Sequence, residues 1–247
     1  MMSTTVVSMM SSEEKKKENF NDEEEKLYVA NLAEANKELQ ELYDLEGSDK
    51  MQILKLLTRL RQLCLEPRLV YDNIDQPSSK LKACMELIKT MQENKQKVLL
   101  FSSFTSVLDL IAEECQKAGI TYYMLTGSTN KEDRRELVSR FQKDDTTVFL
   151  ISLKAGGTGL NLTSAEAVIH FDPWWNVSAQ NQATDRAYRI GQKNNVQVFN
   201  LVMKDSVEEK IIELQKRKKE LADMFVENNS GGLSQMSKED ILSLFTM

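Results

Sequence analysis

The chain has 247 residues, of which 41% are hydrophobic and 28% are charged, so it can form one large domain, or one domain with appendages. Its formal net charge of −6 excludes a protein that holds nucleic acid by bulk positive charge, and a polyanion would have to bind at a local site. Cys64, Cys84 and Cys115 are isolated and lack CxxC spacing, which argues against a disulfide framework or a zinc cluster and favours buried, inert thiols in a reducing compartment.

The sequence contains neither an apolar run of membrane-spanning length nor a secretion signal at its start. We therefore expect a cytoplasmic protein with no membrane partner, which would be nucleoid-associated if its source is bacterial.

The first 79 residues divide into a tail and a helical segment. Residues 1–21 are polar and aperiodic, which is typical of a disordered tail. From residue 22 the apolar positions step by four and three, as on one face of an amphipathic helix. Gly47 interrupts this pattern, a second helix over 51–65 ends before Pro67, and a polar linker completes a helical insertion over 22–79. The first stripe consists of Tyr28, Leu32, Ala35, Leu39 and Leu42.

Residues 80–205 alternate between amphipathic helices and short apolar strands. Fully apolar strands separated by helices predict a parallel sheet covered by helices on both faces, an α/β fold. Thr129 and Glu132 have the spacing of a capping box at the start of one of these helices. A C-terminal helical extension over 206–247 follows. The expected strands lie at 97–103, 120–127, 147–152, 167–171 and 196–202.

Three loops that leave these strands carry polar or glycine residues. Ser102 and Ser103 follow the first strand, Thr126 and Ser128 follow the second, and a glycine-rich loop over 153–162 follows the third. Ligands of such sheets bind at the carboxyl ends of the strands, and glycine lets backbone amides approach a phosphate closely. One such loop alone could be a flexible turn, but three at one edge indicate a site for a phosphorylated ligand.

Aromatic and basic residues follow the fourth strand. Trp174 and Trp175 lie in a loop where one of them could stack on a base or a sugar. Arg186 and Arg189 are three residues apart and share one face of a short helix, and their planar guanidinium groups suit phosphate oxygens. His170 is the single histidine of the sequence and lies in an apolar strand, so we expect it to be a core residue.

The segment "SLKAGGTGLNLTSAEAVIHFDPWWN" followed by "QATDRAYRIGQ" closely resembles motifs V and VI of the Swi/Snf-type DNA translocases of helicase superfamily two. "VLLFSSF" and "LTGST" resemble two further motifs of that family, and the resemblance extends over about residues 22–247. It implies that 80–205 form a RecA-like C-terminal helicase lobe. The segment "SVEEKIIELQKRKKELAD" is similar to the helix that follows this lobe in bacterial members. This chain has Val177 where family members usually have proline.

The resemblance also implies roles for individual residues. Arg186 and Arg189 would act as arginine fingers on the phosphates of ATP, and Gly159, Asn161, Gln182 and Asp185 would lie at the nucleotide. The residues implied to contact the DNA backbone are Ser102, Ser103, Thr126, Ser128, Lys154, Gly156, Gly157 and Trp175.

The sequence contains no G-x-x-x-x-G-K-[ST] motif and no Asp-Glu pair after a strand that could hold Mg²⁺. We therefore expect ATP and Mg²⁺ to be held mainly by a first, N-terminal lobe, without which the chain would be inactive. The partners would be that lobe, double-stranded DNA and DNA-bound proteins. Two alternatives stay open: a non-catalytic DNA-binding or docking module derived from such a lobe, and a metabolic enzyme that binds a sugar phosphate.

Overall fold

The computed structural model of the protein describes residues 12–44, 50–156, 162–174, 196–224 and 237–246. Within these residues, six strands form one sheet in the order β1-β6-β5-β2-β4-β3, and every neighbouring pair is parallel. The strands are β1 (Ser12–Glu18), β2 (Val98–Ser102), β3 (Tyr122–Leu125), β4 (Val148–Ser152), β5 (Ala167–His170) and β6 (Gln197–Met203). This sheet confirms the predicted α/β fold.

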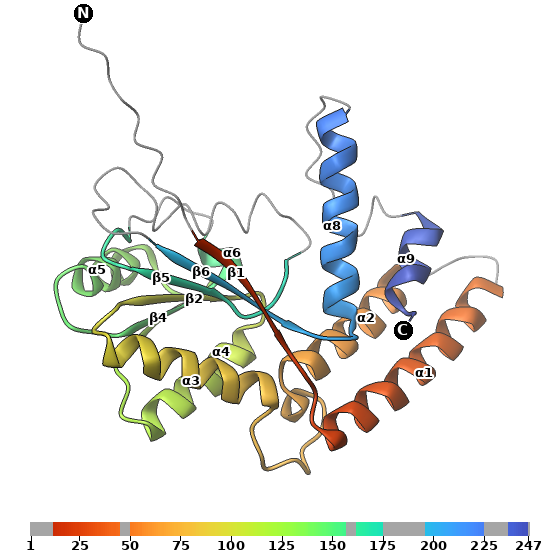
Figure 1. The fold of residues 1–247 in the computed structure, drawn as a ribbon, viewed down its shortest axis with the longest axis horizontal. Helices are drawn as coiled ribbons and strands as arrows, with labels where there is room; N and C mark the ends of the chain where they lie inside the picture. The colour runs from red at the N-terminus through yellow and green to blue at the C-terminus, as the bar shows by residue number, and fades with distance from the viewer. Residues whose placement is uncertain (1–11, 45–49, 157–161, 175–195, 225–236, 247) are drawn as a thin grey trace, which may run out of the picture.

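Helices cover both faces of the sheet (Figure 1). Helices α3 (Ser79–Glu93) and α4 (Thr105–Lys117) contribute to the apolar core on one face, together with Val98 and Leu100 of β2. Helix α5 (Lys131–Phe141) contributes to the core on the other face, together with Leu99 and Phe101. Successive strand residues point to opposite faces, and all of these β2 residues are buried because the sheet is covered on both sides.

Apart from a one-turn helix after β4, the remaining described helices form a group beside the sheet (Figure 1). Along the chain, helices α1 (Asp22–Asp44) and α2 (Lys50–Leu65) lie between β1 and the other strands. A short 3₁₀ helix, η1 (Pro67–Leu69), follows α2. Helices α8 (Val207–Met224) and α9 (Lys238–Leu244) follow β6, and the one-turn helix α6 (Leu153–Gly156) follows β4. Of the predicted stripe, Tyr28, Leu32, Ala35 and Leu39 are buried and Leu42 is partly buried, which confirms the inward face of the first helix.

The structure corrects the interpretation of residues 1–21 as a tail. Residues 12–18 form β1, which pairs along its full length with β6, from Ser12 opposite Gln197 to Glu18 opposite Met203. The sequence "SEEKKKE" has low β-propensity, but charged residues are common on edge strands, where they discourage pairing with other chains. Backbone pairing with the edge of β6 therefore outweighs the low β-propensity of this segment. Lys17 also forms an ion pair of 2.6 Å with Glu209.

The three cysteines are buried, as the sequence predicts. Burial raises the pKa of all three thiols, that of Cys115 to about 12. Because the thiolate is the reactive form of cysteine, these side chains are inert members of the core.

Candidate nucleic-acid interface

The loops that follow four of the strands lie at one edge of the sheet. Strands β5, β2, β4 and β3 are neighbours in that order and all run parallel, so the segments that follow Ser102, Leu125, Ser152 and His170 leave the sheet at the same edge. The sequence-based expectation that the three polar loops meet at one edge is confirmed for their described residues.

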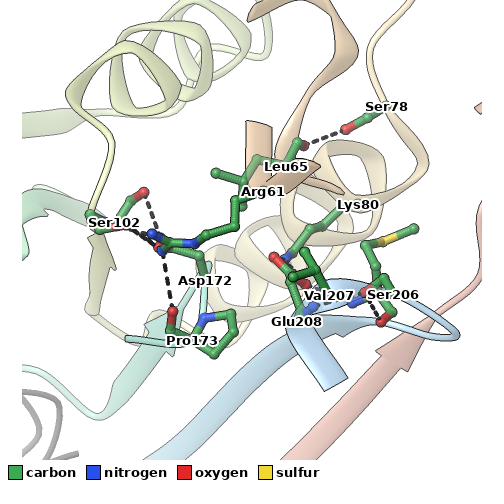
Figure 2. A network of polar contacts seen from close by, with 12 residues as sticks. Arg61, Leu65, Ser78, Lys80, Ser102, Asp172, Pro173, Ser206, Val207 and Glu208 are labelled. Atoms are coloured by element: carbon green, nitrogen blue, oxygen red, sulfur yellow. Dashed lines mark hydrogen bonds and ion pairs between the residues drawn. The ribbon is translucent and has the colours of Figure 1, made fainter. Parts of the chain in front are cut away.

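The turn after β2 is organised by a carboxylate from the loop after β5 (Figure 2). Ser102 Oγ donates a hydrogen bond of 2.7 Å to Asp172 Oδ1, and the backbone N–H of Ser103 donates to the same oxygen at 3.0 Å. The hydroxyl of Ser103 donates to Asp172 Oδ2. Asp172 and Ser102 are 1% and 0% exposed, so the Ser102 hydroxyl faces the interior, whereas Ser103 is half-buried.

A cation from α2 completes this network. Arg61 Nη2 lies 2.8 Å from Asp172 Oδ2 and also donates to Ser103 Oγ at 2.9 Å and to the carbonyl of Pro173 at 3.3 Å. Its guanidinium carbon lies 4.9 Å from the centre of the Phe104 ring, within cation–π range. Arg61 is buried, and burying such a charge is tolerated because it is paired and hydrogen-bonded.

Sequence reasoning missed both Asp172 and Arg61. The signal for Asp172 was its position directly after the apolar strand "AVIHF", where an acidic residue reaches the sheet edge. Arg61 carried no comparable signal, because it lies between the inward-facing Leu60 and Leu63 of α2 and its partner is 111 positions away.

The turn after β3 presents hydroxyl groups toward solvent. The Oγ atoms of Thr126 and Ser128 are 2.8 Å apart, and Thr129 Oγ1 accepts a hydrogen bond of 3.1 Å from the backbone N–H of Thr126. Ser128 is exposed. Asn130 rather than Thr129 caps α5, because Asn130 Oδ1 accepts from the backbone N–H groups of Glu132 and Asp133 at 3.0 and 2.9 Å; the predicted capping box at Thr129 is therefore wrong.

The segment after β4 places a lysine at the same edge. Lys154 lies in α6 and is exposed, while its neighbours Leu153 and Ala155 are buried. The guanidinium of Arg134 in α5 donates to the carbonyl of Ala155 at 3.1 Å. This contact ties α5 to the start of the glycine-rich loop. Gly156 is the last residue of α6.

The predicted nucleotide-binding residues lie outside the part of the chain that the structure describes. These are Gly159, Asn161, Gln182, Asp185, Arg186 and Arg189, and Gly157 and Trp175 of the predicted DNA contacts lie outside it as well. Trp174 is the last described residue before this gap. It is partly buried against the core on the α5 face, and its carbonyl accepts a hydrogen bond from Gln215 of α8.

A second buried ion pair lies beside the Asp172 network (Figure 2). Lys80 Nζ lies 2.6 and 2.7 Å from the two carboxylate oxygens of Glu208, and both side chains are 0% exposed. Glu208 Oε2 also accepts from the backbone N–H of Met203 at 2.8 Å. Burial raises the pKa of Glu208, and the charge of Lys80 opposes that rise.

Among the described helices, none has the length and apolar composition needed to cross a membrane. The described residues also contain no group of three or more histidine, cysteine, aspartate or glutamate side chains that could hold a metal ion.

Comparison with known proteins identifies the class of the domain. Residues 79–191 match the helicase conserved C-terminal domain, so the chain contains such a domain. An ATP-dependent helicase of Mycoplasma pneumoniae is 37% identical over 91% of this chain, which spans 22% of that protein. The C-terminal domain of the Sulfolobus solfataricus SWI2/SNF2 ATPase superposes with a TM-score of 0.76 at 26% identity, over 95% of this chain and 98% of that one.

The same Sulfolobus ATPase core solved in complex with double-stranded DNA matches with a TM-score of 0.76 at 29% identity, over 95% of this chain and 50% of that one. The chain therefore belongs to the Swi2/Snf2 family and carries its C-terminal helicase lobe. It spans about a fifth of the length of the curated relatives that it matches.

Proposed function

We propose that this chain is the second motor lobe of an ATP-dependent translocase or remodeller that acts on double-stranded DNA. One observation carries the proposal: loops with hydroxyl and glycine residues and one lysine leave neighbouring parallel strands at one sheet edge, in a chain whose residues 79–191 match a helicase C-terminal domain. The DNA complex of the similar Sulfolobus core supports duplex DNA as the polymer that this edge contacts.

The nucleotide side of the proposal rests on the sequence. Arg186 and Arg189 would reach the phosphates of ATP across a cleft between two lobes, with Gly159, Asn161, Gln182 and Asp185 lining this lobe's side of the cleft. Arginine fingers stabilise charge on the transferring phosphoryl group and are worth about 10³–10⁵ in rate. The first lobe would hold most of the nucleotide and its Mg²⁺, so we propose that this lobe alone does not turn over ATP.

The DNA side of the proposal assigns the exposed groups of the edge to phosphate contacts. Thr126, Ser128, Lys154 and Gly156 lie on the described segments, and Gly157 and Trp175 would extend this surface. The backbone N–H and the hydroxyl of Ser103 already donate to Asp172, so Ser103 would line this surface without offering these donors to a phosphate. The hydroxyl of Ser102 is buried against Asp172. Ser102 would therefore stabilise the turn rather than contact DNA itself. Phosphate contacts carry no sequence information, so binding would be independent of DNA sequence. Closure of the lobes on ATP would shift these contacts along the duplex and drive the motor against DNA-bound proteins.

The test is DNA-stimulated ATP hydrolysis by this chain joined to a first lobe of the same family. Arg186→Ala and Arg189→Ala should each lower the turnover rate by about 10³-fold or more, because each removes a cation from the transition state. Arg217→Ala is a matched control, since that arginine lies on α8 and its side chain is 58% exposed. Full activity of both finger variants would refute the assignment of the arginines.

The alternative function is a docking module without catalysis. The apolar side chains of Met51 and Leu54 on α2, which are 61% and 40% exposed, favour a protein contact there. This alternative predicts no ATP turnover in the fusion while the chain still binds duplex DNA or a protein partner. Turnover that requires the two arginines would exclude it.

A further inference from the structure

The turn between β2 and α4 directs its donors inward. Ser102 Oγ, Ser103 N–H and Ser103 Oγ donate to the carboxylate of Asp172, and the backbone N–H of Phe104 donates to Ser102 Oγ at 3.1 Å. The fourth donor to Asp172 is Arg61 at 2.8 Å. An ionised carboxylate offers about four acceptor positions, so these four donors use the full capacity of Asp172.

The sheet places the two loops next to each other. Phe101 pairs with His170 in the register of β2 and β5, and the backbone N–H of Phe171 donates to the carbonyl of Phe101 at 2.9 Å. The residues that follow, Ser102 and Asp172, are therefore neighbours at the carboxyl edge. The backbone pairing of β2 with β5 positions the carboxylate of Asp172. The carboxylate then holds the turn after β2 by hydrogen bonds.

Arg61 connects this edge to the helical group. Its helix, α2, packs with α1 and α8, and Leu57, Leu60 and Leu63 lie in their common core. The guanidinium reaches out of that core to Asp172, Ser103 and Pro173. The loops after β2 and after β5 are thus fastened to α2 by one side chain.

We propose that Asp172 and Arg61 are positioning residues for the DNA-contacting edge. They fix the conformation of Ser102–Phe104 and couple this turn to α2, so that the helical group and the edge move as one body during the motor cycle. This inference rests on the proposed function, because it assumes that the turn faces DNA.

The neighbouring pair Lys80–Glu208 provides a matched control. It is also a fully buried ion pair. Glu208 accepts from the backbone N–H of Met203, its own backbone N–H donates to Ser206 Oγ, and Lys80 Nζ lies 5.2 Å from the centre of the Phe171 ring. Among the described residues, no hydrogen bond of this pair reaches a predicted DNA-contacting residue. A variant of Glu208 therefore reports the effect of losing a buried ion pair that makes no hydrogen bond to the turn.

The experiment compares Asp172→Asn, Glu208→Gln and the double variant Arg61→Met with Asp172→Asn, all in the full chain. Asparagine keeps the shape of aspartate but replaces one acceptor by a donor, and the double variant removes both charges, so that no unpaired charge stays buried. Three quantities are measured: the free energy of unfolding, single-residue amide hydrogen exchange over 101–106, and binding to a fluorescent DNA duplex.

We expect Asp172→Asn and the double variant to speed exchange at Ser103 and Phe104 by about 10- to 100-fold and to weaken duplex binding about tenfold, as expected for the loss of hydrogen bonds to a charged group. The double variant should regain most of the stability that Asp172→Asn loses, but not the DNA affinity. Glu208→Gln should lower stability without selective exchange in the turn.

The inference is overturned if Asp172→Asn matches Glu208→Gln in the exchange of the turn and binds duplex DNA as the unmodified chain does. It is also overturned if restoring stability in the double variant restores DNA affinity. Failure of the unmodified chain to bind duplex DNA would count against the proposed function instead, and the exchange measurement would still decide whether Asp172 and Arg61 position the turn.

Discussion

At the residue scale, His170 illustrates how burial controls a titratable group next to the site. It ends β5, is 1% exposed, and stacks on Phe101 with 5.6 Å between the ring centres. Burial lowers the pKa of His170 to about 4, although the negative charge of Asp172 opposes this shift. The expectation of a core histidine is confirmed, and the folded protein holds a neutral imidazole at neutral pH.

His170 should therefore make the stability of the protein depend on pH. The ordinary pKa of histidine is 6.5, so the unfolded chain binds the proton first as the pH falls. The stabilising contribution is fully present above pH 6.5 and is lost on acidification toward pH 4, at about 1.4 kcal/mol per pH unit within that window. Urea unfolding at a series of pH values should show this component in the unmodified chain and lack it in His170→Gln.

The assignment is direct because the sequence contains one histidine. Carboxylates also titrate near the acidic end, but they are common to both proteins and cancel in the difference. If the two stability profiles run parallel between pH 6.5 and 4.5, the pKa of His170 is not lowered by burial.

At the element scale, helices from the two ends of the described chain share one core. Residues of α1 and α2 pack with Val207, Ile211 and Leu214 of α8 and with Leu244 of α9. The backbone N–H of Val207 donates to the hydroxyl of Tyr28 at 2.7 Å. The helical insertion over 22–79 and the extension over 206–247, which the sequence-based division separates, therefore stabilise each other.

Ile211→Ala should destabilise the protein as strongly as a substitution in the core of the sheet. Ile211 is 0% exposed, and truncation of a buried isoleucine to alanine costs about 2–5 kcal/mol because it leaves a cavity. Denaturant unfolding measures the change. Leu242→Ala in α9 is the control: its side chain is 37% exposed, and we expect an effect within about 0.5 kcal/mol for a surface position. Equal small effects would mean that α8 does not contribute to the fold.

The sequence predicted what local patterns encode. The five apolar runs between residues 97 and 202 predicted strands β2 to β6, and their alternation with helices predicted the parallel sheet and the common edge of the loops. It failed for β1, whose charged residues become a strand only through the edge of β6. It also failed for the pairing of Arg61 with Asp172, because a contact across 111 positions depends on how α2 packs against the finished sheet.

At the scale of the whole molecule, charge limits how the protein can hold DNA. The net charge of −6 repels a polyanion at long range, so attraction must come from cations concentrated at one edge. Lys154 in α6 is an exposed lysine of that edge, directly after β4, the strand that neighbours β3. Neutral hydroxyl and backbone donors add contacts to DNA but release no counterions. The slope of log affinity against log salt concentration therefore reflects the number of cationic side chains that contact phosphates.

Lys154→Gln should reduce the salt dependence of duplex binding. Each lysine that neutralises a phosphate adds about 0.9 to the slope of log affinity against log salt concentration, so losing one such contact should lower that slope by about 1 and weaken binding equally for duplexes of different sequence. Fluorescence anisotropy across a series of salt concentrations, with two unrelated duplexes, gives both quantities. Lys117→Gln is the control, because it removes the same charge from the end of α4, where the lysine is 63% exposed and pairs with Glu114. A change of slope shared by both variants would show that net charge governs binding, and only a change confined to Lys154→Gln would support a local contact at the sheet edge.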